Sequence, residues 1–208
     1  MSGEPQARRL SAPSKDETAL LPPFEGLGLA QIVVPRTAAQ FEAAVDELLA
    51  SGVAGFDTEA KPTFAAGQAS EGPHVLQFAL ADKAFIIQPQ REGATAALTR
   101  LLEAESLTKV GFGLQSDRSQ IQARFGLTMR AVLDLDGVFR RLGYPKSIGV
   151  RAAVGLMLGL RFHKSKKTTT SNWALPRLGE RQLLYAANDA YAALMVYRAL
   201  QRDGAALR

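Results

Sequence analysis

The sequence predicts an α/β fold in which a mixed β-sheet of about five strands is flanked by α-helices. Short runs of β-branched and aromatic residues alternate with longer segments whose apolar residues recur every three or four positions. Three strand-like runs also follow one another within residues 53–88, and this order is typical of a mixed sheet rather than a purely parallel one. At 208 residues, of which 47% are hydrophobic, the chain is long enough to bury one core.

The first half of the chain begins with a short strand at residues 31–34. Thr37 then caps a helix, with Gln40 three residues later as in a capping box, and Gly52 ends it. The next strands are expected at residues 53–59, 74–80 and 84–88, the last two joined by a hairpin turn. Residues 61–73 are rich in Gly, Pro and Ser, so a loop is expected there.

The second half of the chain alternates helices and strands. Helices are expected at residues 94–102, 114–125, 147–158 and 180 to about 200, and strands at 107–111 and 131–135. The helix at 114–125 places Leu114, Ile121 and Phe125 on one apolar face. Residues 160–178 are basic and rich in Thr and Ser, so this segment is expected to be irregular.

The two ends of the chain differ in composition. Residues 1–26 contain Pro, Ser and charges of both signs without an apolar signal region, which predicts a mobile arm ahead of a domain at residues 27–208. No segment approaches the roughly 18–20 apolar residues of a membrane span. Cysteine is absent, which excludes disulfides and thiolate sites. We expect a soluble, cytoplasmic protein.

Positive charge gathers in one part of the sequence. Residues 137–179 contain nine Lys and Arg residues and no Asp or Glu, while the rest of the chain has sixteen basic and twenty acidic residues. A segment of one sign suits a polyanion such as a nucleic-acid backbone. A solvated basic face without a partner explains the charge equally well.

Asp57 and Glu59 end a strand made of residues typical of a core. Side chains two apart on a strand share a face, so these carboxylates point the same way. Two like charges near a core edge are costly unless a cation lies between them, and oxygen ligands suit Mg²⁺ or Mn²⁺. A strand that runs out into solvent is the alternative.

Two further places put acids on apolar helix faces. Asp117 lies in the first turn of its helix, on the buried stripe, where it is either a capping group or a site residue. Tyr185 and Asp189 are four residues apart in the last helix and project together. A simple hydrogen bond between the two is the alternative.

These motifs, in this order, resemble those of the DEDD-superfamily 3′→5′ exonucleases, in their tyrosine branch (DEDDy), which includes ribonuclease D and the exonuclease domain of the Werner syndrome protein. The matching segments are Gly-Phe-Asp-Thr-Glu at 55–59, Val-Gly-Phe-Gly at 110–113, Gln-Leu-Leu-Tyr-Ala-Ala-Asn-Asp-Ala at 182–190, and Lys164-Ser165 with Ser-Asn-Trp at 171–173. The resemblance covers roughly residues 32–200.

The resemblance implies a ribonuclease H-like fold and two-metal-ion hydrolysis, with Mg²⁺ or Mn²⁺ as cofactor. Asp57, Glu59 and Asp189 would hold one ion, Asp57 would bridge to the second, and Asp117 would reach the second through water. Tyr185 would orient the attacking water. The substrate would be single-stranded or 3′-ended nucleic acid, DNA or RNA, shortened from its 3′ end with release of 5′-nucleoside monophosphates.

Other residues are candidates for nucleic-acid contacts. Lys164, Lys166 and Lys167 would meet phosphates, with a loop that binds nothing as the alternative. Trp173 and Phe64 would stack on bases, with core packing as the alternative.

Two other sets of polar residues, the pair Asp134 and Asp136 and the histidines His74 and His163, are expected to be structural. Two other functions remain open at this point. One is a non-catalytic nucleic-acid-binding module on a degenerate exonuclease fold, and the other is an endonuclease of related fold.

Overall fold

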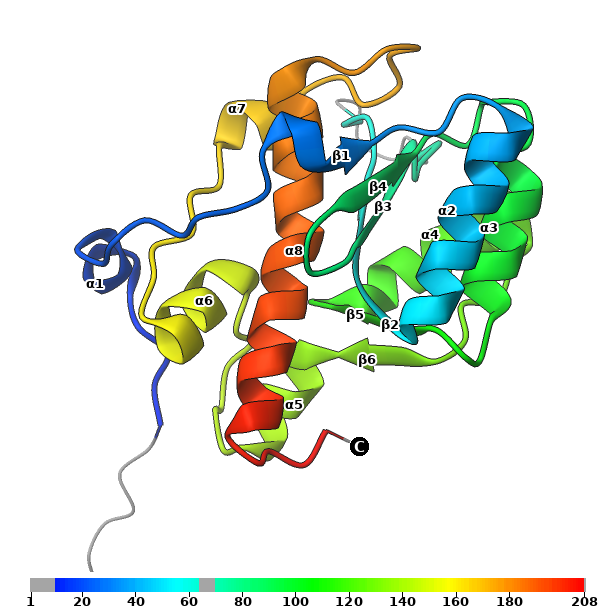
Figure 1. The fold of residues 1–208 in the computed structure, drawn as a ribbon. Helices are drawn as coiled ribbons and strands as arrows, with labels where there is room; N and C mark the ends of the chain where they lie inside the picture. Colours follow the sequence, from blue (N-terminus) through cyan, green and yellow to red (C-terminus); the bar gives the residue numbers. More distant parts are fainter. Residues whose placement is uncertain (1–9, 64–69, 208) are drawn as a thin grey trace, which may run out of the picture.

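The computed structural model describes residues 10–63 and 70–207, and its centre is a six-stranded mixed sheet of order β1-β4-β3-β2-β5-β6 (Figure 1). Strand β3 is antiparallel to both β2 and β4, and the other pairs are parallel. The strands are β1 (Ile32–Val33), β2 (Val53–Glu59), β3 (Val75–Ala79), β4 (Ala84–Ile87), β5 (Thr108–Gly111) and β6 (Val132–Asp134). The predicted fold class is confirmed, and each of the six strands overlaps a run expected from the sequence, including the two-residue edge strand β1.

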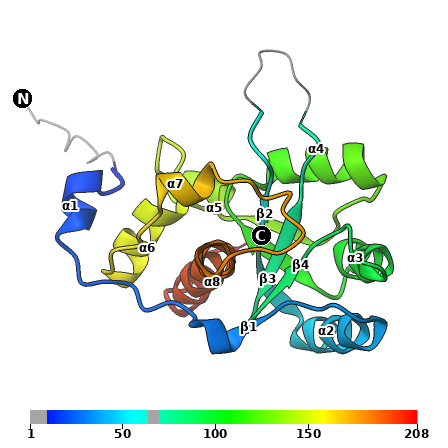
Figure 2. The same cartoon turned by 90° about the horizontal axis from the view of Figure 1, so that it is seen from above.

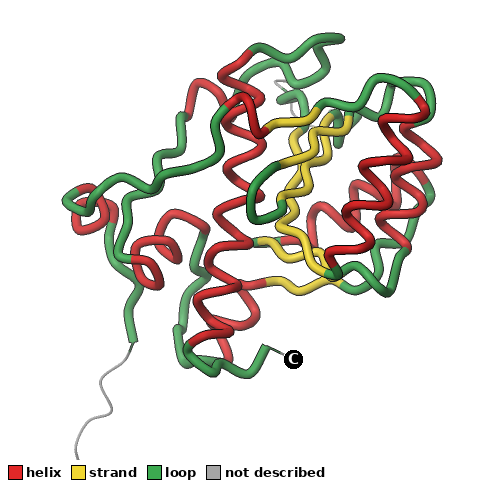
Figure 3. The backbone as a smooth tube through the Cα atoms, in the orientation of Figure 1, coloured by secondary structure: helices red, strands yellow, loops and turns green. Residues whose placement is uncertain are grey.

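Helices cover both faces of this sheet (Figures 1 and 2). One face carries α2 (Ala38–Ser51), α3 (Ala94–Glu103) and α4 (Leu114–Phe125). The other face carries α5 (Leu135–Arg141), α6 (Val150–Leu158) and the long α8 (Glu180–Arg202), with the short helices α1 (Lys15–Ala19) and α7 (Lys166–Thr169) outside them. The tube drawing shows that the strands form the middle layer of a three-layer sandwich (Figure 3).

Alternation along β2 sorts its side chains between the two layers. Ala54 and Phe56 belong to the core beneath α2, α3 and α4. Gly55 and Asp57 lie on the opposite face, toward α8, because side chains alternate along a strand. One strand therefore contributes both to the main apolar core and to the polar site described below.

Helix α8 approaches β2 unusually closely. A Cβ atom on Gly55 would lie 2.8 Å from the carbonyl carbon of Ala190, so only glycine fits at this position. The facing residues of α8 are also small: Ala186, Ala187 and Ala190 are all buried. The axis of α8 therefore lies near enough to β2 for short acidic side chains from the two elements to meet.

The structure also contains helices that the sequence did not predict. Helix α5 follows β6 directly, with Asp134 as its cap, because the Asp134 side chain accepts a hydrogen bond from the Asp136 amide. Helix α7 forms one turn within the segment expected to be irregular, and Ser165 caps it. Helix α6 begins at Val150 rather than at residue 147. Helices of one or two turns are too short to show a clear apolar period.

Residues 10–26, assigned to a mobile arm from the sequence, lie along the surface of the domain. They form α1, whose Thr18 is buried, and then pair with the segment before α7 through hydrogen bonds from Phe24 N to Arg161 O (3.0 Å) and from Arg161 N to Pro22 O (2.7 Å). Residues 1–9 lie outside the described part, and mobility of the arm stays a prediction. Across residues 10–63 and 70–207, no helix is both long and apolar enough to cross a membrane.

The contact between α8 and β2 gives a first prediction. Replacing Gly55 by alanine places a methyl group against the Ala190 carbonyl and should destabilise the protein by about 1–3 kcal/mol, the usual range for overpacking. Gly137→Ala in α5 is the matched control, because its Cβ would meet only the end of Arg141 at 3.6 Å. That change should raise stability by about 0.5–1 kcal/mol. Urea unfolding of both variants measures the difference, and equal stabilities would contradict the close approach.

Candidate active site

Three carboxylates converge where β2 meets α8. Asp57, Glu59 and Asp189 each offer one oxygen atom, and these oxygens all lie within 4.8 Å of one another. Glu59 and Asp189 are buried, with 8% and 4% of their surface exposed. The expectation that Asp57 and Glu59 share a face is therefore confirmed, and α8 supplies the third acid.

Asp117 lies beside this cluster and is held by a residue that the sequence analysis did not identify. Its Oδ1 accepts a hydrogen bond from the hydroxyl of Thr58, the residue between the two acids of β2. The first turn of α4, which carries Asp117, is fixed by Asp134, whose carboxylate accepts from Gly113 N (3.0 Å) and Leu114 N (2.8 Å). The structure therefore brings three of the four predicted carboxylates together. The fourth, Asp117, lies beside them and is hydrogen-bonded to Thr58.

The other acid pair, Asp134 and Asp136, is structural, as expected. Asp134 anchors α4 as described, and Asp136 accepts a hydrogen bond from Ile148 N (2.8 Å) and forms an ion pair with Arg140 (3.2 Å). Of the histidines, His74 is buried and its Nδ1 accepts from Lys61 N (3.2 Å), as expected for a structural residue. His163 is exposed.

Tyr185 lies one helical turn before Asp189 and contacts the segment that carries α7. Its hydroxyl is 2.8 Å from the Thr169 hydroxyl, and its ring centre lies 5.9 Å from that of Trp173. Gln182, in the preceding turn, ties the same segment to α8 by donating to Ser171 Oγ (3.0 Å) and to Asn172 O (3.1 Å). The position of the phenol therefore depends on this segment as well as on α8.

Lys164 places its ammonium group inside the acidic cluster. Its Nζ lies 2.8 Å from Asp189 Oδ2 and 5.5 Å from the centre of the Tyr185 ring. Burial alone would lower the pKa of Lys164, but the negative charges of Asp189 and Asp57 outweigh burial and raise it. Lys164 is therefore a permanent cation in the cluster, a closer role than the phosphate contact predicted from the sequence.

The buried acids repel one another and hold protons more tightly than usual. Burial, followed by the charge of Asp189, raises the pKa of Asp57 to about 8, and burial with the charges of Asp57 and Asp189 raises the pKa of Glu59 to about 9. Burial likewise raises the pKa of Asp117 and of Asp189. Burial and the Asp189 charge also raise the pKa of Tyr185, so the phenol is protonated at neutral pH.

The polar atoms of the cluster fit a bound cation. Apart from the Lys164 ion pair, neither carboxylate oxygen of Asp189 has a hydrogen-bond partner among the described residues, although both are buried. Gln77 of β3 lies directly opposite Asp57 of β2 and is fully buried. The oxygen and nitrogen of its side-chain amide also have no hydrogen-bond partner among the described residues. Buried polar atoms without partners are costly. Closely spaced carboxylates suit a hard divalent ion, so the cluster is a candidate divalent-metal site.

The residues predicted to contact nucleic acid divide into two groups. Lys166 and Lys167 are exposed on α7, as a phosphate contact requires, and Lys167 lines the same pocket as Asp189. The prediction for Trp173 is wrong: its side chain is fully buried, and its indole N–H donates to Thr169 O (3.2 Å), so the ring cannot stack on a base. Phe64 lies outside the described residues.

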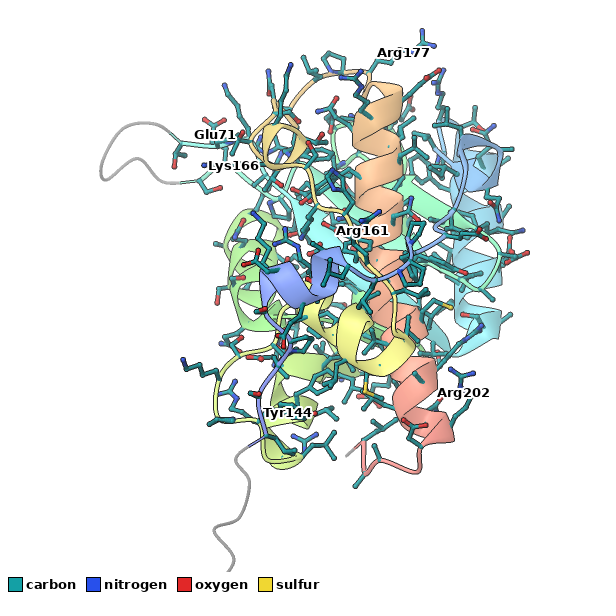
Figure 4. The ribbon with its side chains drawn as sticks, turned by 90° about the vertical axis from the view of Figure 1, so that its left-hand side faces the viewer. Glu71, Tyr144, Arg161, Lys166, Arg177 and Arg202 are labelled. Atoms are coloured by element: carbon teal, nitrogen blue, oxygen red, sulfur yellow. The ribbon has the colours of Figure 1, made fainter. Side chains whose placement is uncertain are left out.

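A cavity of about 470 Å³ opens beside the acidic cluster on the side of α6. Asp57, Asp189, Lys164, Arg151 and Phe112 are among the residues that line it. Figure 4 shows this side of the molecule, with Arg161 near the centre of the view and Lys166, the first residue of α7, to its left. Of the nine basic residues between positions 137 and 179, five line this cavity or its neighbours: Arg151, Arg161, Lys164, Lys166 and Lys167.

The Lys164 ion pair generates a prediction about metal binding in the absence of substrate. Replacing Lys164 by methionine removes a competing cation, so the affinity for Mg²⁺ or Mn²⁺ should rise about 10-fold. Without metal, the same variant should lose about 1–3 kcal/mol of stability, because the acids keep no counter-ion. Calorimetric titration and urea unfolding measure the two effects, with Lys167→Met on exposed α7 as control. Unchanged metal affinity in Lys164→Met would contradict the competition.

Comparison with known proteins adds a family assignment. The sequence model of the 3′-5′ exonuclease family matches residues 32–205. The mouse bifunctional 3′-5′ exonuclease/ATP-dependent helicase WRN is 30% identical over 155 residues, which cover 73% of this chain and 11% of that protein. A 3′-5′ exonuclease of Arabidopsis thaliana is 28% identical over 155 residues, covering 73% of this chain and 54% of that protein. The chain thus spans about half the length of the Arabidopsis relative and a much smaller part of the mouse relative.

Solved structures share the fold. The Nibbler EXO domain of Aedes aegypti superimposes with a TM-score of 0.71 at 26% identity, covering 85% of this chain and 89% of that one. Ribonuclease D of Trypanosoma brucei gives a TM-score of 0.73 at 19% identity, covering 81% of this chain and 64% of that one. The resemblance inferred from the sequence motifs is confirmed, and the chain belongs to the 3′-5′ exonuclease family.

Proposed function

We propose that this chain is a divalent-metal-dependent 3′→5′ exonuclease that releases 5′-nucleoside monophosphates from nucleic-acid ends. The observation that carries the proposal is the convergence of Asp57, Glu59 and Asp189 within 4.8 Å, beside Tyr185, where the Asp189 oxygens have no partner among the described residues apart from the Lys164 ion pair. A fold needs no such cluster for stability, because buried like charges are costly. A site that binds cations explains it.

The carboxylates would hold two ions, Mg²⁺ or Mn²⁺. Asp57, Glu59 and Asp189 would bind one ion, and Asp57 would also bind the second. Asp117, which accepts a hydrogen bond from the Thr58 hydroxyl, would contribute to the second site. Two such ions stabilise the charge that develops in phosphodiester hydrolysis and favour deprotonation of the attacking water.

The protein's own residues would position the reactants. The Tyr185 phenol stays protonated, so it acts as a hydrogen-bonding group that orients water rather than as a base. Its contact with Thr169 fixes the ring in place. Lys164 would contact a phosphate oxygen of the substrate when Asp189 serves as a metal ligand.

The substrate of this proposal is a nucleic-acid strand with a free 3′ end. The five basic residues around the site suit a phosphate backbone. A related structure, ribonuclease D of Trypanosoma brucei, has been solved in complex with RNA U12, with a TM-score of 0.72 to this chain. The choice between DNA and RNA falls to experiment, and a cytoplasmic location is proposed from the sequence alone.

A degradation assay tests the activity directly. We expect 5′-labelled single-stranded DNA or RNA, with Mg²⁺ or Mn²⁺, to give a ladder that shortens from the 3′ end. The ladder should vanish with chelator or in Asp57→Asn. A circular strand should resist cleavage, because only an endonuclease cuts without an end. Binding of both polymers without cleavage would favour a non-catalytic binding module instead.

Substitution of Tyr185 by phenylalanine tests the role of the phenol. Turnover should fall about 100-fold or more, because the attacking water loses its positioning group. Metal affinity and substrate affinity should stay close to those of the wild type, since no carboxylate is changed. Single-turnover cleavage and calorimetric titration separate the two. Wild-type turnover in Tyr185→Phe would remove the phenol from the mechanism.

The raised pKa values predict how metal binding depends on pH. Below the pKa values of Asp57 (about 8) and Glu59 (about 9), metal must displace protons from these acids. The apparent Kd for Mg²⁺ should therefore fall as the pH rises from about 6.5 to about 9 and then level off. Calorimetry in two buffers of different ionisation heat counts the released protons. Affinity that does not change with pH, without proton release, would show that the acids are already ionised.

A further inference from the structure

The arm at residues 10–26 forms one wall of the cavity beside the acidic cluster. Asp57 and Asp189 lie at one side of this cavity of about 470 Å³, and Pro13, Lys15 and Thr18 line it from the arm. Helix α1, which contains Lys15 and Thr18, lies in front of α6 in Figure 4 and beside it in Figure 2. Residues at opposite ends of the sequence thus enclose the same space.

The arm is held in this place by specific contacts. Arg161 donates from its guanidinium to Ala19 O (2.8 Å) and from its backbone to Pro22 O (2.7 Å). Gly155 of α6 lets the arm pack closely, because a Cβ there would lie 2.7 Å from Thr18 Cγ2. Thr18 is 2% exposed as a result. These contacts determine where α1 sits and therefore where the Lys15 side chain lies.

The cavity is lined by more cations than acids, and the arm contributes one of the cations. The cations that line the cavity are Lys15, Arg151 and Lys164, and the acids that line it are Asp57 and Asp189. The other charged residues of α1, Asp16 and Glu17, do not line the cavity. The three cations outnumber the two acids, so the lining carries a net positive formal charge.

We propose that the arm is part of the nucleic-acid-binding surface, with Lys15 of the arm and Arg151 of α6 contacting backbone phosphates of the strand whose 3′ end reaches the acidic cluster. This inference rests on the proposed exonuclease function. It assigns a binding role to a segment that the family motifs do not include, and it makes the docked arm a condition for tight binding.

Binding of labelled single-stranded DNA and RNA, measured by fluorescence anisotropy in the Asp57→Asn background, tests the charges. Each of Lys15→Ala and Arg151→Ala should weaken binding about 5-fold at roughly 0.1 M salt and lower the slope of log Kd against log salt by about 0.7. Lys146→Ala is the matched control, because this exposed lysine belongs to the same acid-free stretch but does not line the cavity. Wild-type affinity and salt dependence in both charge variants would overturn the proposal.

Undocking the arm tests the geometry. Gly155→Leu should displace Thr18 and weaken binding as Lys15→Ala does, and adding Lys15→Ala to it should then cost nothing more, whereas Arg151→Ala should keep its full effect. Tighter binding or faster cleavage in Gly155→Leu would show that the arm covers the site, and would overturn the proposal. If the charge variants lose affinity but no cleavage occurs with any polymer, the binding role stands and the exonuclease proposal fails.

Discussion

The site depends on how closely α8 can approach β2. Gly55 has no side chain, and the small residue Ala190 of α8 faces it, so the helix packs directly against the backbone of the strand. Aspartate is short, and Asp189 can meet Asp57 only at this separation. A larger residue at position 55 would push α8 away from β2 and separate Asp189 from Asp57. The strand order and the core beneath α2 and α3 would stay in place.

Because the acids lie so close together, their negative charges repel one another, and the positive charge of Lys164 offsets part of this repulsion. Four acids are held at least partly out of water, where each favours its neutral form. Lys164 supplies one positive charge to Asp189 from a segment that contacts α8 through Thr169, Gln182 and Trp173. Metal ions and this lysine serve the same acids, so ligand binding at the cluster and the position of the lysine segment are linked.

Local patterns were enough to predict the fold class and to single out the acidic residues, but each acid kept a structural alternative until the motifs were compared with those of the exonucleases. Alternation along β2 predicted that Asp57 and Glu59 share a face, and the structure confirms it. The role of Thr58 and the buried amide of Gln77 depend on which strand and helix lie next to β2, and no local period encodes that. The sequence left Trp173 open between base stacking and core packing, and the choice depended on its neighbours in space, which are apolar residues of α8 and the sheet.

Trp173 is the sole tryptophan of the chain, and its surroundings give it a use in experiments. Its indole lies 5.9 Å from the Tyr185 ring and bonds to the same threonine, Thr169, that holds the phenol hydroxyl. Any ligand that shifts the α7 segment must change the environment of this single fluorophore. Intrinsic emission would therefore report the binding of such a ligand to the unlabelled protein, without a substrate that has to be cleaved.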